Sequence, residues 1–194
     1  MTPPLLVALT VTVTPGMVQF VARMQDYVET HRRLAAGIEQ PLCSTPEEIA
    51  NQADALAAAI REARPRAREG DIFTLAAADV FRARIAAMVA RHGIDVAAAP
   101  RNDGEGAEFE LRVLAAPPWR NDVATWAPIV RALPELPSEL EYRFVGRDLV
   151  LVDTDANIVV DILRDALPQE AHAAPPVVGP TFCHAHPELD VCWM

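Results

Sequence analysis

The sequence contains no lysine, so its 17 basic residues are all arginines, and 27 acidic residues give a formal net charge of -10. We attribute the missing lysines to a bias toward GC-rich codons rather than to chemistry. Nucleic-acid binding depends on concentrated positive charge, which releases counterions from the phosphates. The acidic balance therefore argues against a nucleic-acid partner and favours solubility.

Serine is also scarce, occurring only at Ser44 and Ser138, and neither residue lies in a nucleophile elbow. The sequence has no glycine-rich phosphate loop, no HExxH motif and no paired zinc-ligand motif. These absences leave little on which hydrolase or phosphate chemistry could be built. We expect no catalytic residues, no cofactor and no enzymatic activity.

No apolar run reaches the roughly 20 residues that a membrane-spanning helix needs, so we do not expect an integral membrane protein. The run from Leu5 to Val13 has the length of a signal-peptide core, and the small residues Thr14 and Gly16 fit cleavage after Gly16. The positive charge that usually precedes such a core is missing. A buried strand, or a signal that starts upstream of Met1, would also explain the run.

The segment from Met17 to Gly93 has helical periodicity. Its first part repeats core-type side chains at intervals of three and four residues, which places them on one face of a helix. These residues are Phe20, Met24, Tyr27, His31, Leu34 and Ile38.

A second helix is expected to begin at a cap formed by Thr45. Pro46 needs no amide hydrogen in the first turn, and Glu48 can complete a capping box. Pro65 would end this helix, because an interior proline removes a hydrogen bond. Its predicted seam, which is the apolar stripe expected to face the core, comprises Ile49, Ala53, Leu56 and Ile60.

A third helix is expected from Thr74 to His92, with Gly93 as a left-handed cap. One face of this helix carries Phe81, Ile85 and Met88. Because short links join the three helices, we expect them to pack as an antiparallel bundle.

The pattern changes to β structure after the third helix. Alternation from Phe109 to Val113 predicts a half-exposed strand. A short helix is expected from Pro128 to Leu133, with Trp126 packed ahead of it. Alternation and a Gly146–Arg147 turn predict a three-stranded β-meander between Leu140 and Leu163.

These patterns together predict an α+β fold, in which an N-terminal three-helix layer packs against a small antiparallel β-meander. Residues 1–16 would be a possible signal-peptide remnant. Residues 17–167 would form a single domain, and residues 168–194 a proline-rich C-terminal tail.

The hairpin YRFVGRDLVLVD and the strand ANIVVDIL, with the helix QDYVETHRRLAAGI and the link REGDIFT, resemble a group of uncharacterised bacterial exported proteins. In that group a helical N-terminal half follows a signal sequence, and the resemblance covers most of the chain between Met17 and Leu167. The hairpin alone is loosely similar to the C-terminal hairpin of small periplasmic nickel and cobalt homeostasis proteins. Neither resemblance transfers a catalytic residue. The first one, together with the N-terminal apolar run, implies a periplasmic or secreted protein.

Asp153, Asp155 and Asn157 reproduce positions 1, 3 and 5 of a calcium-binding EF-hand loop. Ile158 stands where that loop needs glycine, and Arg164 stands where it needs a bidentate glutamate. We therefore favour a polar turn in which the Asp and Asn side chains bond their own backbone.

Two further residues are candidate ligands or reactive groups. His31 lies in the seam of the first helix, and we favour a core histidine that is hydrogen-bonded to a neighbour, because no second ligand follows four residues later. Cys43 is interpreted as a buried side chain without a chemical role or, in an exported protein, as a disulfide partner.

A basic cluster lies near the end of the second helix and could bind phosphate or an anionic surface. Acidic residues interleave with it, and positive charge at a helix C-terminus is favoured by the macrodipole, so we favour a solvated helix end. The cluster comprises Arg61, Arg64, Arg66 and Arg68.

The C-terminal stretch CHAHPELDVCWM contains the candidate metal ligands Cys183, His184, His186 and Cys192. Such side chains suit a tetrahedral zinc or copper site, but their spacing matches no established signature. A disulfide between Cys183 and Cys192 is the favoured interpretation for an exported protein, and an unpaired tail is the third alternative.

We expect a non-catalytic accessory or interaction protein that meets an unknown protein partner through a helical face or a sheet edge. The alternative is a metal-binding or metal-homeostasis protein that uses the Cys/His tail. A hydrolase remains a third hypothesis only because sites can assemble from residues far apart in sequence.

Overall fold

A computed structural model of the chain describes residues 14–38, 45–96, 111–117 and 127–169. This part contains the helices α1 (Pro15–Ala35), α2 (Pro46–Ala63), α3 (Leu75–His92) and α4 (Ala127–Val130). It also contains the strands β1 (Leu140–Val145), β2 (Asp148–Asp153) and β3 (Ile158–Leu163). The α+β fold predicted from the sequence is confirmed.

The face of helix α1 that carries the core-type side chains is buried, as predicted. Phe20, Met24, Tyr27 and His31 are each at most 5% exposed, while Leu34 and Ile38 pack partly against the same core. The intervals of three and four residues therefore identified the correct face of this helix.

The local signals at the ends of α2 and α3 are also confirmed. The Glu48 amide donates to Thr45 Oγ1 over 3.2 Å and the Thr45 amide donates to Glu48 Oε2 over 2.7 Å, which completes the capping box. Gly93 ends α3 in the left-handed region with φ 56°, a conformation that carries no Cβ penalty in glycine.

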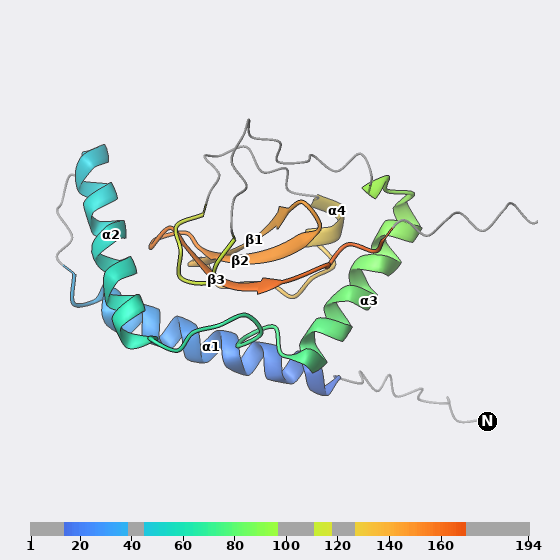
Figure 1. Ribbon diagram of the computed structural model, residues 1–194, viewed down its shortest axis with the longest axis horizontal. Coiled ribbons are helices and arrows are strands. Elements are labelled where there is room, and N and C mark those ends of the chain that lie inside the picture. Colours follow the sequence, from blue (N-terminus) through green and yellow to red (C-terminus); the bar gives the residue numbers. More distant parts are fainter. Residues whose placement is uncertain (1–13, 39–44, 97–110, 118–126, 170–194) are drawn as a thin grey trace, which may run out of the picture.

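The three helices do not close into the antiparallel bundle that their short links predicted. Helices α2 and α3 both pack on α1, but they stand at opposite ends of it with the sheet between them (Figure 1). Apolar side chains from the three helices and from the strands join in the main core. A second, smaller cluster of strand residues packs with Leu111. The sheet therefore lies where α2 and α3 would contact each other in a closed bundle.

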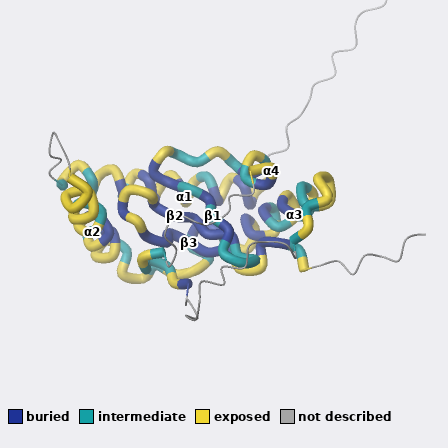
Figure 2. The backbone as a smooth tube through the Cα atoms, turned by 90° about the horizontal axis from the view of Figure 1, so that it is seen from above, coloured by how far each residue is buried: buried dark blue, intermediate teal, exposed yellow. Residues whose placement is uncertain are grey.

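The sheet has the order β1-β2-β3, with antiparallel neighbours, which confirms the predicted meander. Leu140, Tyr142 and Phe144 alternate inward, and Gly146 turns the chain with φ 56°. A register shift lies between Leu151 and Val152 of β2. The strands form the buried centre of the molecule, whereas much of α2 is exposed (Figure 2).

The strand expected at 109–113 is not found in its described part. Residues 111–117 are irregular apart from a turn at Val113 and Leu114, where Leu114 has φ 64°. The segment nevertheless borders β3, because the Leu114 amide donates to Val159 O over 2.7 Å and the Val159 amide donates to Ala115 O over 2.9 Å. The short helix expected from Pro128 to Leu133 is present as α4 but ends at Val130, whereas Trp126 lies outside the described residues.

Asp161 fixes the link between α2 and α3 to the sheet. Its carboxylate is fully buried and accepts hydrogen bonds of 2.7–2.8 Å from the backbone amides of Gly70, Ile72, Phe73 and Ile162. Burial raises the pKa of this carboxyl group, and the four amides partly offset that effect. One side chain on β3 thereby holds in place the part of the link that directly precedes α3.

The predicted signal-peptide core, Leu5 to Val13, lies outside the described residues, so its assignment stays a prediction. Gly16, after which cleavage was predicted, lies in the first turn of α1 and packs closely against Ala76 of α3. Among the described helices, none combines the length and apolar character needed to cross a membrane.

Candidate functional site

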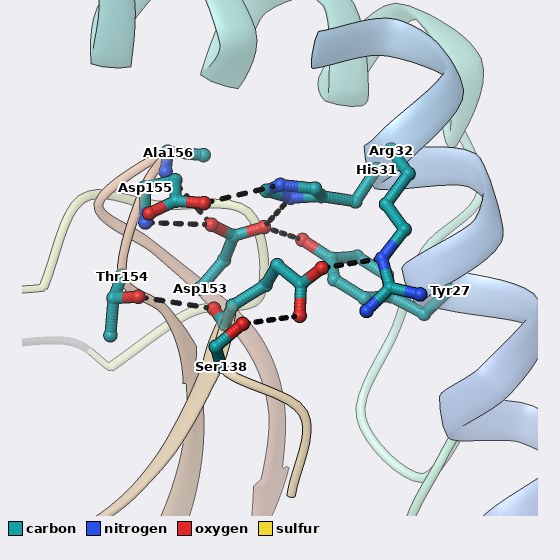
Figure 3. A network of polar contacts seen from close by, with 9 residues as sticks. Tyr27, His31, Arg32, Ser138, Asp153, Thr154, Asp155 and Ala156 are labelled. Carbon is teal, nitrogen blue, oxygen red and sulfur yellow. Dashed lines mark hydrogen bonds and ion pairs between the residues drawn. The ribbon is translucent and has the colours of Figure 1, made fainter. Parts of the chain in front are cut away.

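The buried side chain of Asp153, at the end of β2, joins α1 to the turn between β2 and β3. Its Oδ2 accepts hydrogen bonds of 2.6 Å from both the Tyr27 hydroxyl and His31 Nδ1 (Figure 3). Its Oδ1 accepts from the backbone amides of Asp155 over 3.1 Å and Ala156 over 2.8 Å. A fully buried carboxylate is thus satisfied by four donors, two from α1 and two from its own turn.

His31 connects the buried carboxylate to the surface of the turn. Its Nδ1 faces Asp153, and its Nε2 lies 3.4 Å from Asp155 Oδ2 (Figure 3). The His31 side chain is 3% exposed, whereas that of Asp155 is 59% exposed. Because a carboxylate only accepts hydrogen bonds, the bond to Asp153 places a proton on Nδ1.

Tyr27 lies one helical turn before His31 on the same face of α1. Burial and the neighbouring Asp153 carboxylate raise the pKa of Tyr27 above its ordinary value, so its hydroxyl remains a donor. The guanidinium carbon of Arg64 lies 5.1 Å from the centre of the Tyr27 ring on the α2 side. Tyr27 therefore connects α1 to the sheet through its hydroxyl and to α2 through its ring.

A second link between α1 and the sheet lies beside the first. Arg32 Nε donates to Glu139 Oε1 over 2.5 Å, and the Ser138 hydroxyl donates to Glu139 Oε2 over 3.3 Å (Figure 3). The bond from Arg32 is the main reason why the pKa of Glu139 is lowered. The Thr154 amide donates to Glu139 O over 2.9 Å, which ties this link to the turn after β2.

The turn that these links hold forms one side of a groove with a volume of ≈ 600 Å³. Its polar side carries Thr154, Asp155 and Asn157 from the β2–β3 turn. Its other side comes from the end of α1 and the first turns of α2 and is apolar except for Gln52. The apolar residues on this side are Ala35, Ile38, Pro46, Ile49, Ala50, Ala53 and Leu56. An apolar concave surface with a few polar groups is the usual form of a binding site.

The predicted seam of α2 is wrong in its first half. Leu56 and Ile60 are buried as expected, but Ile49 is 55% exposed and Ala53 is only partly buried. The first turns of α2 extend beyond the core, so these side chains line the groove instead of packing against the sheet.

The arrangement combines a histidine with an acidic partner at Nδ1, as in the base of a catalytic triad. At Nε2, however, His31 faces the Asp155 carboxylate. Within the described residues, no serine, threonine or cysteine side chain hydrogen-bonds to this nitrogen. The geometry suits a rigid support for the turn that presents Asp155 to the groove.

Two interpretations made from the sequence are confirmed here. Asp153 accepts from the backbone of its own turn, as expected for a polar turn, and Asn157 adopts φ 48°. His31 is a buried histidine with a hydrogen-bonded neighbour. Arg164, at the position that excluded an EF-hand, pairs with Glu69 and Asp148.

The basic cluster is only partly a solvated helix end. Arg61 donates to Leu114 O over 2.9 Å, and exposed Arg68 lies 3.7 Å from Asp71. Arg64 differs from the prediction, because its side chain is only 18% exposed and lies over Tyr27. Its guanidinium belongs to the packed junction of α1 and α2.

The candidate metal ligands of the tail, Cys183, His184, His186 and Cys192, lie outside the described residues, as does Cys43. Their predicted roles in a metal site or a disulfide stay predictions. In the described ranges, no group of three or more His, Cys, Asp or Glu side chains is arranged to hold a metal ion.

Comparison of the chain with models of protein families, with curated proteins and with solved structures finds no match. The resemblance to bacterial exported proteins therefore stays a prediction.

The connection between Asp153 and the two side chains of α1 was missed by the sequence analysis. A signal for it was present, because Tyr27 and His31 bring two hydrogen-bonding groups to a face that is otherwise apolar. Buried polar groups need partners, and Asp153 and Asp161 are acidic residues within strongly apolar strand segments. The need to pair buried polar groups would have restricted the hydrogen-bond partners of Tyr27 and His31 to a few acidic residues.

Proposed function

We propose that the protein is a non-catalytic accessory protein that binds a peptide segment of another protein in the groove between α2 and the β2–β3 turn. The observation that carries this proposal is the apolar side of α2, which is exposed at Ile49 and lines the groove rather than the core. Peptide segments that dock in grooves bury apolar anchors of this kind.

The polar side of the groove suggests the chemistry of the bound segment. Asp155 is the charged residue among the described residues that line it, and its side chain is 59% exposed. The adjoining links at Asp153 and Glu139 hold the turn before binding, which reduces the entropy lost on association. A segment with one arginine or lysine beside apolar side chains would complement both sides.

Selection of displayed random peptides against the full chain tests this proposal. Enriched peptides are expected to carry a basic residue next to apolar residues, and Ile49→Asp should reduce their affinity at least about tenfold. Val18→Asp is the matched control, since Val18 is exposed to 54% on α1 and does not line the groove. Selection against Asp155→Arg should enrich acidic peptides instead.

Three outcomes would contradict the proposal. They are the failure to enrich any peptide, equal losses of affinity in Ile49→Asp and Val18→Asp, and the same peptide charge for the wild type and Asp155→Arg. Chemical-shift changes on titration with an enriched peptide should lie in the first turns of α2 and in the β2–β3 turn.

We further propose that the protein acts in the periplasm or outside the cell. The apolar run from Leu5 to Val13 and the resemblance to exported proteins support this location. A C-terminal fusion to a reporter that is active only after export should be active. Thiol labelling of the exported protein should modify Cys183 and Cys192 only after reduction. An inactive reporter would refute the location.

A further inference from the structure

A second recess lies between α1 and the segment that leads from α2 to α3, with a volume of ≈ 350 Å³. It shares none of its lining residues with the groove beside the β2–β3 turn. Three arginines line it, Arg23 and Arg33 from α1 and Arg64 from the end of α2, together with Asp26 and Asp71. The charged groups therefore leave one net positive charge in a protein whose total charge is -10.

Two of the arginines are available to a ligand. Arg23 and Arg33 are exposed, and within the described part of the chain neither makes a hydrogen bond or an ion pair. The Thr30 hydroxyl between them already donates to Asp26 O over 3.0 Å. The donors that remain in the recess are therefore guanidinium groups.

Arg64 is held at the recess with its hydrogen-bonding capacity unfilled. Its guanidinium lies over Tyr27, and Nη2 is 3.6 Å from Asp71 Oδ2, a loose ion pair. Its Nη1 is buried and has no hydrogen-bond partner. A buried donor without an acceptor is uncommon in native proteins and often marks the place of an absent ion or water.

The surrounding contacts keep this arrangement in place. Pro65 follows Arg64 and prevents α2 from continuing, and the buried Asp161 carboxylate fixes the backbone at Gly70, Ile72 and Phe73. The wall of the recess that carries Asp71 and Ile72 is thereby anchored to the sheet. Such a preformed wall reduces the ordering that binding would require.

We propose that this recess binds a phosphate group, either as free phosphate or as a monoester on a small molecule. Guanidinium groups offer several donors in a fixed plane and match the oxygens of phosphate. A carboxylate has only two oxygens and one charge, which suits a single guanidinium. Three guanidiniums at one recess favour a ligand with more acceptor oxygens than a carboxylate has.

Titration at low ionic strength tests the proposal, because salt would screen exposed arginines. Inorganic phosphate and phosphoserine serve as the two probes, and calorimetry measures their affinities. Tighter binding of phosphoserine would identify a monoester, and tighter binding of inorganic phosphate the free ion. Acetate should bind at least about tenfold more weakly than the better probe.

The variant Arg23→Gln/Arg33→Gln should lower that affinity about tenfold, since each charge-assisted contact contributes a few-fold. Its melting temperature without phosphate should stay within about 2 °C of the wild type, because among the described residues neither side chain makes a hydrogen bond or an ion pair and only the weak interaction of Arg33 with the C-terminal end of α1 is lost. Arg91→Gln is the control: it removes one exposed positive charge from the far end of α3 (Figure 1). The proposal is overturned if neither probe binds, if the double variant binds normally, or if Arg91→Gln loses as much affinity.

Discussion

Replacing each of two buried tyrosines by phenylalanine isolates the contribution of the hydrogen bond between α1 and the sheet. Tyr27 and Tyr142 are 4% and 3% exposed, so the two substitutions remove the same hydroxyl from equally buried positions. The Tyr27 hydroxyl donates to Asp153 over 2.6 Å. The Tyr142 hydroxyl is buried without a hydrogen-bond partner.

The expected effects of the two substitutions are opposite in sign or clearly different in size. A hydrogen bond to a charged acceptor contributes about 1.5–3 kcal/mol, so Tyr27→Phe should lower the free energy of unfolding by about 2 kcal/mol. Tyr142→Phe removes an unsatisfied hydroxyl and should leave stability unchanged or raise it by up to about 1 kcal/mol. In both variants the ring packing is retained, including the contacts of Arg64 and Phe81.

Urea unfolding followed by circular dichroism measures both values, and a loss of about 2 kcal/mol should lower the melting temperature by about 6 °C. A double-mutant cycle with Asp153→Asn should show that Tyr27→Phe costs at least about 1 kcal/mol less when the carboxylate is absent. Equal destabilisation by Tyr27→Phe and Tyr142→Phe, or a cycle without coupling, would refute the assignment of Asp153 as the acceptor.

Three further outcomes follow from the packing and from the tail. Gly16→Ala should cost about 3 kcal/mol in urea unfolding, because its Cβ would lie 2.1 Å from Ala76 O, whereas Gly37→Ala, with 3.4 Å to its nearest atom, should cost less than about 1 kcal/mol. Asp161→Asn should cost about 2–3 kcal/mol at neutral pH, because its amide group faces backbone donors. Since the folded protein holds the Asp161 proton more tightly than the unfolded chain, its contribution to stability should fall as pH rises above about 4 through the raised pKa, and this slope should be absent in the variant. Under the metal-binding alternative, removal of residues 168–194 should abolish the zinc or copper content of the purified protein, and unchanged metal content would exclude the tail.

Features that depend on neighbouring residues could be predicted from the sequence. The capping box at Thr45, the left-handed Gly93 and the Gly146 turn are each determined by a few adjacent residues, and all three are present in the structure. The buried face of α1 was equally accessible, because helical geometry relates residues three and four positions apart. These signals determined the helices, the meander and the fold class.

Contacts between distant segments could not be predicted in the same way. The polar turn explains the bonds to one oxygen of Asp153, but the donors to its other oxygen, Tyr27 and His31, lie more than 100 residues away in sequence. Likewise, nothing local to Asp161 shows that it fixes the α2–α3 link, 88 to 91 residues earlier. Such partners are decided by how the helices pack on the sheet, whereas the short links between the helices predicted a closed bundle.

The exposed half of α2 shows why a correct local prediction can give a wrong one about burial. The capping box satisfies backbone groups of the first turn within the helix itself, so this turn can form without support from the core. The helix therefore extends past the last residues that pack on the sheet, and Ile49 remains on the surface with its apolar periodicity intact. Such an apolar side chain gains free energy only when another surface covers it. The side chains of α2 that deviate from the predicted seam thus line the groove where we propose that a partner binds. This wall of the groove forms whether or not the partner is bound.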